Sequence, residues 1–113
     1  MRLPNSDLAE IDSRKLHDYV LSPTHPVGRF KARFFVALGY SHERWQEFEA
    51  DIRSQHLTQD AELSETLRLG QLWTIRAILK GPNGQSAVVV SVWFVPAERG
   101  APRFVSAYPG RNK

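Results

Sequence analysis

A hairpin signal in the second half of the chain constrains the fold more than any other feature. Residues 71–80, QLWTIRAILK, alternate along the chain as a strand with two different faces does. The GPNG segment 81–84 then places proline at the first central position of a type I turn and glycine where a bulge needs positive φ. Residues 85–95 return as a strand, and no charged side chain lies between Lys80 and Glu98. Such a strand is typical of the middle of an antiparallel sheet.

The alternation also predicts which side chains of this hairpin share a face. We expect one face to lie under helices, formed by Val88, Val90, Val92 and Phe94. The opposite face should carry side chains suited to binding, contributed by Thr74, Arg76, Val89, Ser91, Trp93, Phe104, Ser106 and Tyr108.

The first half of the chain has the period of helices. Caps and apolar stripes predict helices over about 13–21, 28–38 and 42–55, with Asp12 as the first N-cap and Gly39 as a left-handed C-cap. Pro23 and Pro26 lack N–H donors, so residues 22–27 between the first two helices should form an ordered loop. Residues 56–64 have no clear period, and strands are expected at 103–108 and, as a weaker candidate, 65–69. Helices followed by an antiparallel meander make an α+β domain with the helices on one sheet face.

Length and composition agree with a single domain spanning 1–113. The chain has 113 residues, of which 42% are hydrophobic and 24% charged, an ordinary globular composition. It has no cysteine, which excludes disulfides, thiol nucleophiles and cysteine-based zinc sites. No run approaches the ~20 apolar residues of a membrane span. We therefore expect a soluble, cytoplasmic protein without a membrane partner.

Charge is distributed unevenly. The net charge is +3 with a pI near 9.6, and basic residues cluster at 29–33 and near the C-terminus while acids concentrate between Glu43 and Glu65. This permits a polyanionic partner. A solvated surface with scattered charge explains the same distribution equally well.

The segment 22–35, SPTHPVGRFKARFF, is the first candidate site. An imidazole such as His25 moves protons near neutral pH, while Lys31 and Arg33 can stabilise charge on phosphate oxygens. From the residues alone, the favoured alternative is that His25 anchors a loop by bonding to a backbone carbonyl.

The predicted binding face of the sheet is the second candidate. Trp93 or Tyr108 can stack on a base, and Arg76 can pair with a phosphate. The alternative is an ordinary half-exposed sheet with Trp93 partly in the core. The four histidines show no ligand-like spacing with acids, and no HExxH, GxGxxG, Walker or GxSxG motif occurs, so we predict no metal and no cofactor.

Several segments together resemble a family of small bacterial domains of unassigned function. The most specific is the HP-G--KA block, which lies inside the second of the matching segments, LPN (3–5), KLHDYVLSPTHPVGRFKARFF (15–35), ALGY (37–40), GPNG (81–84), SVWFV (91–95) and PRFVSAY (102–108). Such domains occur in toxin–antitoxin pairs and as tips of polymorphic and contact-dependent toxins. Their architecture looks similar to the barnase, EndoU, colicin and RelE ribonucleases.

The resemblance implies an endoribonuclease toxin that needs no cofactor and is neutralised by a small antitoxin protein. In it, His25, Lys31, Ser91 and Tyr108 would be catalytic, with His25 and Tyr108 moving protons and Ser91 orienting a phosphate oxygen. RNA, in some cases on ribosomes, would be bound by Arg33, Arg76, Trp93 and Arg103. Arg76 departs from the family pattern, which often has an acid there. The alternative is a non-catalytic module that binds RNA or protein, including a neutralising partner of a toxin.

Overall fold

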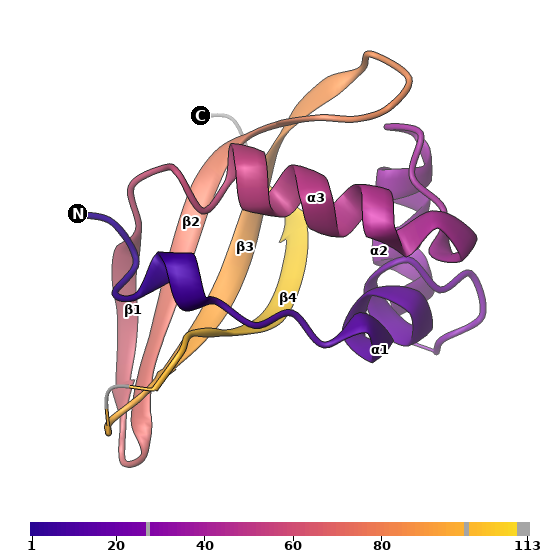
Figure 1. Cartoon of the computed structure of the whole chain (residues 1–113). Coiled ribbons are helices and arrows are strands. Elements are labelled where there is room, and N and C mark those ends of the chain that lie inside the picture. Colours follow the sequence, from indigo (N-terminus) through magenta and orange to yellow (C-terminus); the bar gives the residue numbers. More distant parts are fainter. Residues whose placement is uncertain (27, 99, 111–113) are drawn as a thin grey trace.

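The computed structural model describes residues 1–26, 28–98 and 100–110, which form helical segments followed by one four-stranded sheet (Figure 1). The elements in chain order are η1 (Ser6–Leu8), α1 (Ser13–Lys15), η2 (Leu16–Val20), α2 (Gly28–Val36), η3 (His42–Arg44), α3 (Trp45–Gln55), β1 (Glu62–Leu67), β2 (Gly70–Lys80), β3 (Ser86–Pro96) and β4 (Arg103–Pro109). The predicted α+β class is confirmed.

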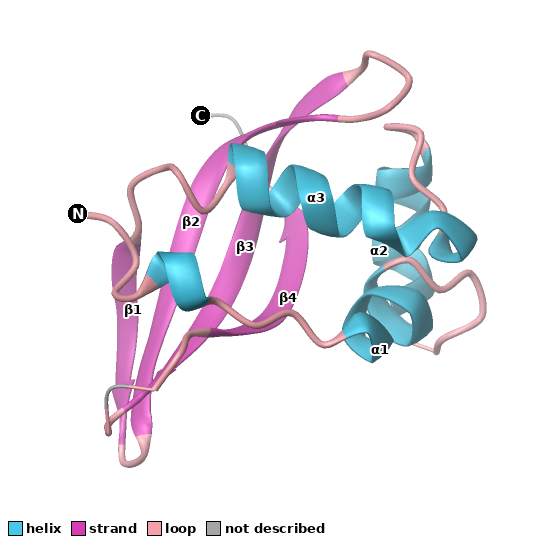
Figure 2. Cartoon of the chain, viewed as in Figure 1, coloured by secondary structure: helices cyan, strands magenta, loops and turns pink. Residues whose placement is uncertain are grey.

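The sheet is an antiparallel meander with strand order β1-β2-β3-β4. Helix α3 crosses one face of it, while α1 and α2 stand beyond the edge strand β4 (Figure 2). The hydrophobic core lies between α3, the buried sides of η2 and α2, and the covered face of the sheet. Its largest fully buried hydrophobic residues are Leu16, Val20, Leu21, Phe35, Tyr40, Phe48, Ile52, Ile75, Leu79, Trp93 and Phe104.

Local signals explain where the helices begin and end. The Asp12 side chain accepts a hydrogen bond from the backbone N–H of Arg14, as expected of an N-cap. The first helix then widens into a π-helical turn over Leu16–Val20, so that the predicted helix is present but not uniformly α-helical. Gly39 has φ 99°, which confirms the left-handed residue predicted after α2.

The predicted assignment of sheet faces was wrong for β3, because the hairpin turn is one residue longer than expected. Gln85 belongs to the turn, where its carbonyl accepts a hydrogen bond from Gly81 N–H, and Lys80 pairs with Ser86. A shift of one residue turns every side chain of a strand to the other face. Val89, Ser91, Trp93 and Val95 therefore lie under the helices, and Val88, Val90, Val92 and Phe94 occupy the uncovered face.

A β-bulge in β4 makes a second correction. Trp93 pairs with Phe104 and Val92 pairs with Ser106, which leaves Val105 as the extra residue. Phe104 is therefore in the core at 1% exposure and does not share a face with Ser106 and Tyr108. The uncovered face, called the open face below, has two cross-strand rows near β4, Thr74–Val92–Ser106 and Arg76–Val90–Tyr108.

Candidate active site at the β4 edge

Lys31 joins three elements at the edge of the open face. From α2, its Nζ donates hydrogen bonds to the Tyr19 hydroxyl at 2.9 Å and to the Ser106 hydroxyl at 2.9 Å. Nζ also lies 4.8 Å from the centre of the Tyr19 ring, a cation–π distance. All three side chains are half-buried, so the cluster is held in place yet remains accessible.

His25 lies directly beside this cluster. Its ring meets the Tyr19 ring edge to face, with centroids 4.8 Å apart. The predicted loop is held by hydrogen bonds over its described part, because the buried Ser22 hydroxyl accepts from the N–H groups of Thr24 and His25; Val27 lies outside the described residues. The His25 carbonyl then accepts from Arg29 N–H at the start of α2. The loop thus holds the imidazole next to Tyr19.

Lys31 also changes the acidity of its neighbour. The hydrogen bond from the Lys31 ammonium lowers the pKa of Tyr19, against the opposing effect of burial. A phenol with a lowered pKa is a better proton donor near neutral pH. The cluster therefore combines a cation, an acidified phenol and an imidazole within one small surface region.

Tyr108 and Arg76 extend this surface along the open face. Tyr108 follows Ser106 by two residues, so its side chain leaves the same side of β4, and it is 39% exposed. Arg76 is exposed in the same cross-strand row, on the far side of Val90. These two predicted site residues therefore share a face with Lys31's partner Ser106.

Ser91 and Trp93 lie elsewhere, in a closed polar network inside the core. Both are 0% exposed. Trp93 Nε1–H donates to the Ser91 hydroxyl at 2.9 Å, and His56 Nδ1 is 2.8 Å from the same hydroxyl. His56 Nε2 lies 3.2 Å from the Ala77 carbonyl, which can only accept. Nε2 thus carries the hydrogen, and Ser91 donates to Nδ1. The predicted convergence of Ser91 with Tyr108 is wrong, because the two lie on opposite faces.

Burial fixes the protonation state of this network. Desolvation lowers the pKa of His56 to about 4, and the hydrogen bond to Ala77 offsets this only partly. His56 is therefore neutral at physiological pH. His56 lies just after α3, at the start of the expected irregular connection, and its buried ring packs the end of α3 against the sheet.

Arg33 is not part of the Lys31 cluster. The two residues are two positions apart on α2, and side chains at that spacing do not face each other. Arg33 is exposed and lines a separate hollow with Pro23, Arg29 and Val36.

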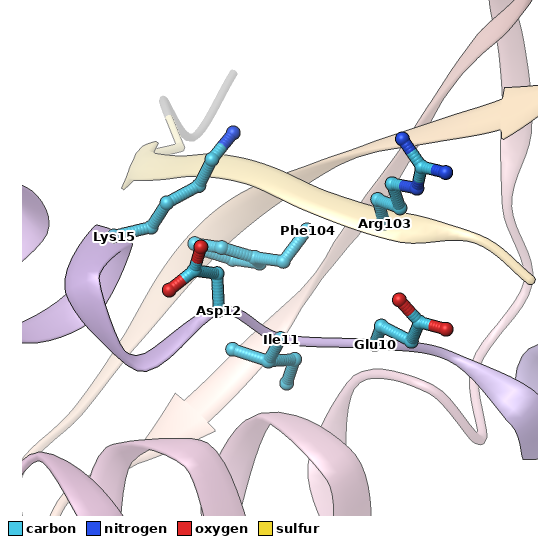
Figure 3. A pocket seen from close by; sticks show the side chains of 6 residues that line it. All are labelled: Glu10, Ile11, Asp12, Lys15, Arg103 and Phe104. Atoms are coloured by element: carbon cyan, nitrogen blue, oxygen red, sulfur yellow. The ribbon is translucent and has the colours of Figure 1, made fainter.

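Arg103 lies at the other end of β4, in a hollow of about 510 Å³ lined by Glu10, Ile11, Asp12, Lys15, Arg103 and Phe104. Figure 3 shows the Lys15 and Arg103 side chains at opposite ends of this hollow, with Phe104 between them. An adjoining hollow, also lined by Asp12 and Lys15, contains Tyr19 and His25. Because Asp12 and Lys15 line both hollows, the hollow of Arg103 lies next to that of His25.

Sequence reasoning missed Tyr19 as a site residue and did not assign a catalytic role to Ser106. The spacing of Tyr19 from Leu16 fits the apolar stripe of a helix, so the sequence pattern favours a core position for Tyr19. A polar hydroxyl six residues before His25 was the available signal. Across the described parts of the chain, no three metal-ligating side chains come together, and no helix is long and apolar enough to cross a membrane.

Comparison with known proteins places the chain in a family. A family profile matches residues 2–111, nearly the whole sequence. The chain belongs to the family described as domain of unknown function DUF6883. No curated protein matches its sequence.

The fold of this DUF6883 domain is shared by a chain of known structure. It is a chain in the contact-dependent growth inhibition toxin–immunity protein complex from Klebsiella pneumoniae 342. The two chains are 19% identical with a TM-score of 0.61, and the match covers 88% of this chain and 98% of the other. At this identity the likeness concerns the fold.

Proposed function

We propose that this DUF6883 domain is an endoribonuclease toxin that cleaves RNA without a metal ion. The observation that carries the proposal is the Lys31 ammonium bridging the Tyr19 and Ser106 hydroxyls beside the His25 ring. Cleavage of RNA by its own 2′-OH needs a base, an acid and a cation near one phosphate. Side chains alone supply all three here.

In the proposed step, neutral His25 takes the proton of the ribose 2′-OH, and the 2′ oxygen forms a bond to the adjacent phosphorus. The bond from phosphorus to the 5′ oxygen breaks, and Tyr19 gives its hydroxyl proton to that leaving oxygen. The products are a 2′,3′-cyclic phosphate end and a 5′-hydroxyl end. Proton exchange with water then restores both side chains.

Lys31 stabilises the charge that develops on the non-bridging oxygens, and its effect on Tyr19 favours proton donation. Ser106 takes the role expected of Ser91, which is buried in the core. Tyr108 stacks on a neighbouring base, while Arg76 on the open face and Arg103 beyond Lys15 contact flanking phosphates. Arg33, on another side of α2, makes at most an outlying phosphate contact.

The toxin role has separate support. The solved structure with this fold comes from a toxin–immunity protein complex, which makes growth inhibition the setting to test. The resemblance of the HP-G--KA block to domains of bacterial toxins points the same way. A neutralising protein partner follows from this proposal.

The test compares purified wild type with His25→Ala and Lys31→Ala on total and ribosome-associated RNA in the presence of EDTA. His42→Ala is the matched control, because this histidine lies on η3 outside the cluster. We expect cleavage that leaves 2′,3′-cyclic phosphate ends, reduced by about 100-fold or more in the two variants and unchanged in the control.

Two results would overturn the enzyme proposal. If the wild type binds RNA but leaves it intact, the domain is a binding module. If cleavage persists in folded His25→Ala and Lys31→Ala proteins, the chemistry does not belong to this cluster. Growth arrest on expression of the wild type, relieved in both variants, tests the toxin role separately.

A further inference from the structure

Strand β1 forms one edge of the sheet. Among the described residues no strand lies along its outer side, and all six residues of β1 are exposed. The N-terminal arm hydrogen-bonds to the residues just before β1, where Arg2 pairs with Asp60 and Ala61 N–H donates to the Met1 carbonyl. Proteins usually protect such an edge with charged side chains or proline, with a β-bulge, or with a covering segment. β1 has two glutamates and a bulge at Ser64, since Leu63 pairs with Trp73 and Glu65 with Leu72. Proline and lysine are both absent from residues 62–67.

Apolar side chains gather along the same edge. Leu63, Leu67 and Leu69 are 49%, 37% and 73% exposed, on β1 and the tip of the β1–β2 hairpin. A hollow of about 360 Å³ begins at the end of β1 and extends across β2 to the end of β3, beneath the N-terminal arm. It is lined by Pro4, Asn5, Thr66, Leu67, Gly70, Gln71, Val95, Pro96 and Ala97. An edge that offers main-chain hydrogen bonds together with a side-chain pocket is how sheets recognise an added strand.

The charge of the edge indicates what kind of strand fits. Glu62 and Glu65 lie on β1, and among the described residues neither forms an ion pair. Opposite charges across a strand pair stabilise it, and like charges directly opposite destabilise it. Nucleic acid is disfavoured at this edge. A second copy is disfavoured too, because it would bring the glutamates of two β1 strands together on one ribbon.

We infer that β1 is a docking edge for an extended segment of another protein. The segment pairs with β1, carries lysine or arginine against Glu62 and Glu65, and places an apolar side chain in the hollow beside Leu67. β1 and β4, the strand that carries Ser106, are opposite edges of the sheet (Figure 1). A partner could therefore occupy the β1 edge whether or not the β4 edge cleaves RNA, and the inference does not rest on that activity.

The probe is an acetylated and amidated eight-residue peptide, TKVKVKLT, titrated into the isotope-labelled full chain. We expect backbone amide shifts confined to β1 and the lining of the hollow. Glu65→Lys should weaken binding about fivefold, the factor that corresponds to a cross-strand pair of about 1 kcal/mol. Glu43→Lys is the matched control, because Glu43 is an exposed acid on η3. This variant should bind the peptide with the same affinity as the wild type.

Three outcomes would overturn the inference. The first is no shift in β1 at millimolar peptide. The second is equal binding of the peptide TEVEVELT, which would show that the glutamates do not select the partner. The third is a concentration-dependent dimer whose β1 amides change without peptide, which would make a second copy the occupant. Because Glu65 is exposed, loss of folding in Glu65→Lys is not expected, and a thermal melt checks this.

Discussion

Acidification should destabilise this protein through His56 in particular. The imidazole is fully buried, neutral, and held between the Ser91 hydroxyl and the Ala77 carbonyl. Protonation would place a hydrogen on Nδ1, where Ser91 now donates, and would bring a charge into the core. Both effects disfavour protonation of His56 in the folded state, and neither acts in the unfolded state.

The loss of stability on acidification follows from the difference between the pKa of His56 in the folded and unfolded states. The pKa of His56 is lowered to about 4 in the folded protein, against 6.5 for a free imidazole. Above pH 6.5 both states are neutral, so this group does not change stability. As pH falls below 6.5 the unfolded state binds a proton that the folded state refuses, and stability drops by 1.36 kcal/mol per pH unit until about pH 4. The full loss is about 3 kcal/mol.

The assay is urea unfolding at several pH values from 4 to 7.5, followed by tryptophan fluorescence, for wild type and His56→Gln. Carboxylates titrate in both proteins, so the difference between their free energies of unfolding isolates His56. We expect His56→Gln to be less stable at pH 7.5 and to lose less stability on acidification. Between pH 7.5 and pH 4, the wild type should lose about 3 kcal/mol more unfolding free energy than His56→Gln.

Two parallel pH curves for wild type and His56→Gln would refute this reasoning. So would an NMR titration in which the His56 ring protonates near pH 6.5 in the folded state. Either result would mean that solvent reaches the imidazole and that the hydrogen-bond chain does not hold it neutral.

Two smaller predictions test the turn and the phenol. Gly81→Ala should cost about 3 kcal/mol of unfolding free energy, because a Cβ there would lie 1.9 Å from the Leu38 carbonyl oxygen. Gly84→Ala should cost about 1 kcal/mol, because a Cβ there meets no atom but the residue has φ 87°; equal urea midpoints for the two variants would contradict the packing argument. Tyr19→Phe should slow RNA cleavage and remove the alkaline limb of its pH–rate profile, since the lowered pKa of Tyr19 would set that limb. An unchanged profile would remove Tyr19 from the reaction.

Much of the fold was predictable because local signals agreed. The N-cap Asp12, the left-handed Gly39 and the alternation over residues 71–80 each act within a few residues, and each appears in the structure. The sheet faces were not predictable in the same way. In residues 87–95 both alternating sets of side chains are apolar apart from Ser91, so the pattern does not show which set faces the core. The length of the turn before β3 decides this.

The candidate site was predictable only in part. His25 and Lys31 could be predicted because Pro23, Pro26 and Gly28 mark a loop and the start of a helix around them. Their partners come from η2 and β4, and Lys31 lies 75 positions from Ser106 in the sequence. The β-bulge at Val105 decides that Ser106 faces Lys31 while Phe104 enters the core. No periodic pattern in one sequence reports where a bulge falls.

The two polar clusters of this domain differ in their remaining capacity for hydrogen bonds, and this difference separates scaffold from candidate site. In the core, Trp93 donates to Ser91, Ser91 to His56 and His56 to Ala77, so the chain ends on a carbonyl and no donor is left over. At the β4 edge, an ammonium has three donors, and the described residues use two of those on Lys31. The third, together with the hydroxyl hydrogens of Tyr19 and Ser106, can be donated to an anionic oxygen. A serine on a strand is therefore poor evidence for a site until its partners are known. Ser91 has a closed set of partners and Ser106 an open one, so Ser106→Ala should impair cleavage whereas Ser91→Ala should impair stability.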